Sequence, residues 1–110
     1  MNIQHQDLAS GRWIKMPFFE QMANVGSEIE RTMKWKEKGN KEYSQMAFQR
    51  AFELLDLTIS DSKNINRLKE LVRLREALND YFVFENEYHS TGNSWSKYFY
   101  SFNYASRLGR

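Results

Sequence analysis

The chain has 110 residues, and 16 Lys and Arg against 14 Asp and Glu give it a formal net charge of only +2. A charge this close to neutral excludes a general electrostatic attraction to nucleic acid. The absence of cysteine excludes disulfides, thiol catalysis and zinc–thiolate sites. Eight Phe, six Tyr and three Trp are many aromatics for one small domain. We therefore expect some of them to stay exposed as an oligomer contact or a binding surface.

The hydropathy pattern favours a cytoplasmic protein without a membrane segment. Residues 1–13 lack the apolar core of a signal peptide, and no apolar run reaches the ~18 residues that a membrane span needs. Residues 1–15 are polar and read as an N-terminal extension, with Trp13 and Ile14 as an anchor onto the body of the protein. Residues 16–110 form one helical bundle domain in this interpretation.

The first predicted helix follows Pro17, which suits a first helical turn, and ends at Gly39-Asn40, a common C-terminal signal. Its core stripe lies at helical spacing: Phe18, Met22, Val25, Ile29 and Met33. A second line on the same helix lies off that stripe: Asn24, Glu28, Arg31 and Trp35. This line is a solvated face, a dimer seam or one wall of a site, and we keep it as an interface candidate together with Tyr100 and Tyr104.

The second predicted helix, residues 43–59, is the most apolar stretch of the chain. Its apolar side chains cover roughly two-thirds of the helix circumference, so we expect neighbours on more than one side. Arg50 projects from inside this apolar arc. Either its guanidinium is buried and paired, with Glu53 as the nearest candidate, or it reaches the surface along its aliphatic stem.

The third predicted helix spans residues 64–84 and places Arg75 within its apolar arc, with the same two alternatives. Residues 85–93 read as a loop, and Asn93 or Ser94 can cap a fourth helix. Strand-like alternation is absent. The sequence therefore predicts an all-α, up-down-up-down four-helix bundle.

The charges of the third helix are unevenly distributed. Residues 62–75 contain five cations and one acid: Lys63, Arg67, Lys69, Arg73 and Arg75 against Glu70. In an antiparallel bundle Arg12, Lys15, Arg107 and Arg110 share this end, so a positive patch able to hold phosphates can form there. The alternative is a solvated basic face balanced by nearby acids.

Most catalytic motifs are missing. The chain has no Gly-rich phosphate loop and no Glu-x-x-His pair, and with only His5 and His89 we expect no metal and no cofactor. Glu53-Leu-Leu-Asp56 resembles half of the magnesium-binding pattern of all-α nucleoside triphosphate pyrophosphatases of the MazG type. The companion Glu-x-x-Glu is absent, because Glu28 is followed by Arg31.

The general organisation of residues 16–108, a cysteine-free and aromatic-rich four-helix domain, resembles HEPN domains and the substrate-binding bundles that accompany minimal nucleotidyltransferases. The resemblance implies handling of nucleotides or nucleic acid. HEPN ribonucleases carry an Arg followed a few residues later by His, and this chain departs from that pattern. Arg75 lies too far upstream of His89, so the ribonuclease active site is not carried over.

Our leading hypothesis is a dimeric helical module that contacts a nucleotide or nucleic acid without a recognisable catalytic motif. In this hypothesis Arg67, Lys69 and Arg73 take phosphates, and Arg50, held by Glu53, shapes the floor of a cleft. The alternatives are a scaffold that binds a partner protein and a metal-dependent pyrophosphatase.

Overall fold

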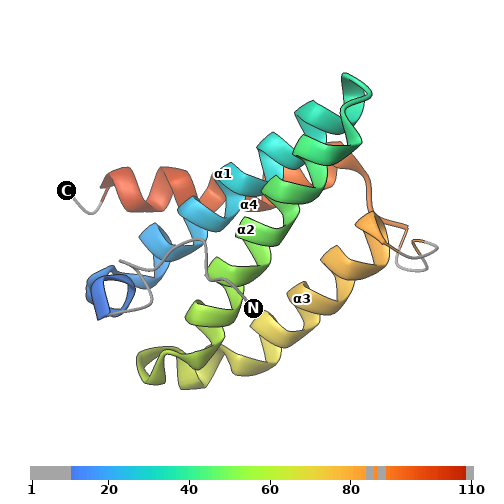
Figure 1. The fold of residues 1–110 in the computed structure, drawn as a ribbon. Coiled ribbons are helices and arrows are strands. Elements are labelled where there is room, and N and C mark those ends of the chain that lie inside the picture. The colour runs from blue at the N-terminus through green and yellow to red at the C-terminus, as the bar shows by residue number, and fades with distance from the viewer. Residues whose placement is uncertain (1–10, 84–85, 87–88, 109–110) are drawn as a thin grey trace.

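The computed structural model describes residues 11–83, 86 and 89–108, and its elements are all helical (Figure 1). The elements are the 3₁₀ segments η2 (Trp13–Lys15) and η3 (Ser62–Arg67) and the helices α1 (Phe18–Glu37), α2 (Lys41–Ser60), α3 (Leu68–Phe82) and α4 (Gly92–Leu108). The predicted all-α four-helix bundle is confirmed. The predicted third helix, however, begins as the 3₁₀ segment η3 and becomes α-helical only at Leu68.

The turn between α1 and α2 follows from two adjacent residues. Gly39 adopts a left-handed φ of 77°, and its amide donates to the Lys36 carbonyl while the Asn40 amide donates to the Trp35 carbonyl. This is the Schellman pattern of helix termination. The Asn40 side chain then accepts from the Tyr43 amide at 3.0 Å and caps α2. Gly39-Asn40 thus ends one helix and starts the next, which lies antiparallel beside it (Figure 1).

The cap of α4 differs from the prediction. Neither Asn93 nor Ser94 is the N-cap, because the helix begins at Gly92. Thr91 and Ser94 instead cap it reciprocally: the Ser94 amide donates to Thr91 Oγ1, and the Thr91 amide donates to Ser94 Oγ, both at 3.0 Å. Threonine outside the helix therefore supplies the capping box.

The helices α1 and α2 each contact two other helices of the bundle. α1 lies against both α2 and α4, whereas α3 runs beside α2 (Figure 1). The buried residues of α2 form a single stripe, and Tyr43 and Met46 on its flank are 47% and 42% exposed. The expectation that residues 43–59 have neighbours on more than one side is confirmed, since α2 contacts both α1 and α3. Its flank at Tyr43 and Met46, however, is partly exposed and lines a surface hollow.

The core joins all four helices and the N-terminal segment. Its largest fully buried side chains include Trp13, Met22, Ile29, Leu55, Leu71 and Leu78. Trp13 is the anchor that the sequence predicted, but its neighbour Ile14 is 58% exposed. The helix α3 contributes Leu71, Leu74 and Leu78 to this core, and Tyr98 of α4 donates to Glu70 of α3 at 3.2 Å.

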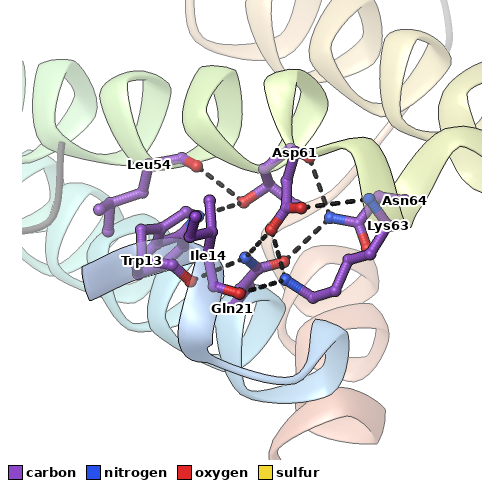
Figure 2. Close-up of polar contacts among 8 residues, drawn as sticks. Trp13, Ile14, Gln21, Leu54, Asp61, Lys63 and Asn64 are labelled. Carbon is purple, nitrogen blue, oxygen red and sulfur yellow. Dashed lines mark hydrogen bonds and ion pairs between the residues drawn. The ribbon is translucent and has the colours of Figure 1, made fainter. Parts of the chain in front are cut away.

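A buried polar network fixes the N-terminal segment to the end of α2 (Figure 2). Trp13 Nε1 donates to Thr58 Oγ1 at 3.0 Å, and Gln21 Nε2 donates to the Trp13 carbonyl at 3.0 Å and to Asp61 Oδ2 at 2.9 Å. Asn64 Nδ2 closes the network by donating to Gln21 Oε1 at 3.0 Å. Because these buried polar groups have partners, the network specifies one packing of α1 against the α2–α3 junction.

The pKa of Asp61 is set within this network. Burial alone raises it, but hydrogen bonds from the Lys63 ammonium, the Gln21 amide and the Lys63 backbone outweigh burial, so the pKa lies below its ordinary value of 3.8. The ionised form therefore stabilises the folded state above pH ~4, and this contribution is lost as the pH falls through the lowered value.

We expect Asp61→Asn to lower the free energy of unfolding by about 1–3 kcal/mol at pH 7, because Gln21 and Lys63 lose a charged acceptor. The deficit should shrink as the pH falls below ~4. Urea unfolding over a pH series measures it, with Asp56→Asn as the control, since Asp56 has a side chain 53% exposed. An Asp61→Asn deficit that stays constant down to pH 2 would contradict the linkage.

Gly26 lies at a close contact between α1 and α4. A Cβ built at this position lies 2.6 Å from Cβ of Phe99, which is only 4% exposed. We expect Gly26→Ala to lower the free energy of unfolding by about 1–3 kcal/mol, because α4 has to shift outward. The exposed neighbour Ser27→Ala is the control and should change it by less than about 0.5 kcal/mol. Equal effects in the two variants would mean that α1 and α4 are not in such close contact.

Candidate ligand site at Trp35 and Arg50

A buried carboxylate on α1 holds two guanidinium groups. The Glu28 side chain is 8% exposed, and its Oε1 accepts from Arg31 Nη1 at 2.7 Å while its Oε2 accepts from Arg50 Nε at 3.1 Å. Each oxygen thus has its own cation, which offsets the cost of burying the charge. One carboxylate between two arginines leaves the group with a net positive charge.

Arg50 lines a surface hollow between α1 and α2 with a volume of about 280 Å³. The other lining residues are Trp35, Tyr43 and Met46. The rings of Trp35 and Tyr43 meet edge to face, with centroids 4.8 Å apart and an interplanar angle of 80°. The hollow therefore combines an aromatic pair, a thioether and one edge of a fixed guanidinium.

A further cation lies at the rim of this hollow. Lys38 Nζ is 5.2 Å from the ring centroid of Trp35, within the range of a cation–π contact. Lys38 is the C-cap of α1 and comes directly before the Schellman turn. The turn therefore places a lysine, a tryptophan and the first residues of α2 together. Trp35, which the Lys38 ammonium approaches, lines the same hollow as Arg50.

Two alternatives were open for Arg50 and Arg75: a buried ion pair, or a guanidinium that reaches the surface. The first applies to Arg50 and the second to Arg75. Arg50 is 25% exposed at its side chain and is ion-paired with Glu28 of α1, a partner that the sequence did not suggest. Arg75 is not buried: its side chain is 42% exposed, and its Nε donates to Asp56 Oδ1 at 2.8 Å. The Arg75 guanidinium also lies 4.8 Å from the Phe52 ring centroid, so its aliphatic stem and guanidinium cover an aromatic on the surface.

The candidate phosphate-binding residues of the third helix do not join Arg50. Asp56, the partner of Arg75, and Arg50 project about 120° apart around α2, since they are six residues apart. The Arg67 guanidinium lies 4.2 Å from the ring centroid of Phe18, at the start of α1. Lys69 and Arg73 are exposed, one helical turn apart on α3. The structure thus separates Arg50 from the candidates of η3 and α3, which do not all lie on one surface.

The predicted interface candidates are divided as well. Glu28, Arg31 and Trp35 belong to the group around Arg50. Asn24 is exposed, and its amide donates to the Glu20 carbonyl of its own helix at 2.8 Å. Tyr100 and Tyr104 are 62% and 54% exposed on α4 and form a stacked pair with centroids 6.5 Å apart. Arg110, predicted for the positive patch, lies outside the described residues.

Sequence reasoning missed Tyr43, Met46 and Lys38 as site residues, although a signal was present. Tyr43, Met46 and Arg50 recur at i, i+3 and i+7 and therefore share one flank of α2. The Gly39-Asn40 turn folds Tyr43 back onto Trp35. Comparing the residues of α1 near Trp35 with the flank of α2 on the other side of this turn would have grouped Trp35 with Tyr43, Met46 and Arg50.

Three further findings bear on the chemistry. Among the described residues no group of three or more His, Asp or Glu could hold a metal ion. In the same part of the chain no helix is both long and apolar enough to cross a bilayer. Comparison with known proteins finds no match to any family model, curated protein or solved structure.

We expect the buried pair Glu28–Arg50 to be energetically coupled and the exposed pair Asp56–Arg75 to be nearly uncoupled. A double-mutant cycle with Glu28→Gln and Arg50→Leu should give about 1–3 kcal/mol, because the shielded carboxylate is the acceptor. The matched cycle with Asp56→Asn and Arg75→Leu should give less than about 1 kcal/mol. Urea unfolding measures both cycles, and equal coupling energies would show that Glu28 does not fix Arg50.

Proposed function

We propose that this protein binds single-stranded nucleic acid at the hollow between Trp35 and Arg50, without catalysing a reaction there. One base enters the hollow against Trp35 and Tyr43, and the Arg50 guanidinium and the Lys38 ammonium contact the flanking phosphates. The observation that carries the proposal is a guanidinium held by a buried carboxylate beside a partly exposed aromatic pair.

The chemistry of the hollow suits an unpaired base. Aromatic side chains stack on any base face, and such contacts contribute about 1–3 kcal/mol per base. Recognition of single strands combines this stacking with cations that follow the phosphates. A hollow of about 280 Å³ offers room for one ring system. In a duplex the base faces are covered by their neighbours, so the proposal commits to the single strand.

Local charge supports the same function despite the small net charge of the chain. Arg50 lines the hollow, Lys38 lies on the ring of the lining residue Trp35, and Arg31 shares the Glu28 carboxylate with Arg50. The resulting positive charge is confined to this part of the surface, because the net charge of the whole chain is only +2. The resemblance to HEPN-like bundles points to the same class of ligand and stays a prediction.

The two alternative functions have less support. For the pyrophosphatase, Asp56 of the Glu-x-x-Asp pair is already ion-paired with Arg75. For the scaffold, the exposed pair Tyr100 and Tyr104 is a suitable contact surface for a second copy or a partner protein. This surface lies on α4, so dimerisation and ligand binding can be tested separately. We keep a homodimer through α4 as the second candidate function.

Tryptophan fluorescence provides the test, because Trp13 and Trp95 are 1% and 7% exposed and Trp35 is the more accessible one. A short oligouridylate should quench Trp35 in a saturable manner. With two phosphate contacts, log K should fall with log salt at a slope of about −1.4. Arg50→Leu should weaken binding about tenfold and reduce that slope by about 0.7.

Arg75→Leu is the matched control, since it removes the same side chain from an ion pair at a different surface of α2. It should leave both affinity and slope unchanged. Trp35→Phe should remove most of the quenching signal while the salt dependence, followed by oligonucleotide anisotropy, persists. Equal binding by wild type, Arg50→Leu and Arg75→Leu would overturn the proposal, and loss of binding only in Lys69→Ala/Arg73→Ala would move the site to α3.

A further inference from the structure

A larger pocket lies on the other flank of α2, between the α1–α2 turn and the end of α3. Its volume is about 610 Å³, within the ordinary range for small-molecule sites. Lys36 comes from α1, Phe48 from α2 and Phe82 from α3. Three helices therefore build the pocket, so its shape depends on the tertiary fold rather than on one loop.

The pocket is lined by two cations. These are Lys36 and Lys41, and none of its nine described lining residues is acidic. Lys41 is the first residue of α2, where the positive end of the helix dipole adds to the charge. Lys36 Nζ lies 5.7 Å and 5.9 Å from the ring centroids of Tyr81 and Phe82, so its ammonium sits beside the aromatic part of the pocket.

The pocket also has an apolar surface. The rings of Phe48 and Phe82 have centroids 5.2 Å apart at an angle of 51°, and Val83 extends this surface with 56% exposure. Ser44 also lines the pocket, and its hydroxyl donates to the Thr32 carbonyl at 3.0 Å. The pocket therefore combines two ammonium groups with an apolar surface.

We propose that this pocket is a second ligand site, which binds a small amphipathic anion: a phosphate or carboxylate head group on an aryl or short alkyl body. The head group lies between the ammonium groups of Lys36 and Lys41, and the body lies on Phe48 and Phe82. Neither the ammonium groups nor the apolar surface alone selects such a ligand. A bare anion loses the apolar contact, and a neutral arene loses the contacts with both ammonium groups.

The second site is separate from the single-strand site. At 100° per residue, Lys41, Gln45 and Phe48 fall on one side of the buried stripe of α2, and Tyr43, Met46 and Arg50 fall on the other side. The two hollows thus share no lining residue. This inference goes beyond the proposed function and stands if that function is wrong.

The test uses 1-naphthyl phosphate and 1-naphthoate as probes, followed by the amide resonances of Lys41, Ser44 and Phe48. Inorganic phosphate and 1-naphthol are the probes that lack a body or a charge. We expect at least one naphthyl anion to shift these resonances in a saturable manner and both control probes to bind about tenfold more weakly. The naphthyl anion that binds more tightly identifies the head group.

Lys36→Ala/Lys41→Ala should weaken binding of the naphthyl anion about tenfold, and both lysines are exposed, so the fold is retained. Lys69→Ala/Arg73→Ala removes the same charge from α3 and should leave the affinity unchanged. Arg50→Leu should also leave it unchanged. Equal affinity in wild type and Lys36→Ala/Lys41→Ala, equal binding of inorganic phosphate, or loss of binding in Arg50→Leu would each overturn the assignment.

Discussion

The Glu28 carboxylate is the group on which the proposed site depends. It is buried on α1, and burial of an unpaired carboxylate would be strongly unfavourable. Its two oxygens instead accept from Arg31 of the same helix and Arg50 of the neighbouring helix. The contact both joins α1 to α2 and fixes the Arg50 guanidinium at the rim of an aromatic hollow. The same ion pair therefore serves packing and presents a cation in a defined position.

The remainder of the structure holds α1 and α2 in the alignment that this contact needs. At one end the Gly39-Asn40 turn sets the antiparallel register and brings Tyr43 onto Trp35. At the other end the network of Trp13, Gln21 and Asp61 closes the N-terminal segment onto the α2–α3 junction (Figure 2). Close packing of Gly26 against Phe99 adds α4 on the far side of α1. Each of these contacts is local, and together they fix one arrangement of α1 and α2.

The sequence predicts the helices well because their signals are local. Apolar spacing gives α1 through Met22, Val25 and Ile29, all fully buried, and Gly39-Asn40 gives its end. Sequence patterns fail where contacts between helices determine whether a side chain is buried. The apolar flank of α2 reads as core, but Tyr43 and Met46 line a hollow because no helix covers that side.

The site is predicted only in pieces for the same reason. Arg50 stands out because a charge interrupts an apolar arc, yet its partner is 22 residues away and the pattern of one helix cannot show it. Glu28 and Trp35 appear as a separate line on α1 and are assigned to an interface. Arg75 has the same pattern as Arg50 but reaches the surface, since Asp56 on the rim of α2 accepts from it. Periodicity identifies an arginine within an apolar arc, but it does not indicate whether the guanidinium is buried or reaches the surface.

The most direct measurement is hydrogen exchange at the Nε–H groups of the arginines by ¹⁵N NMR. If Glu28 fixes Arg50, the Arg50 Nε–H exchanges slowly in the wild type and as fast as that of the exposed Arg73 in Glu28→Gln. An Arg50 Nε–H that already exchanges as fast as that of Arg73 in the wild type would contradict the account.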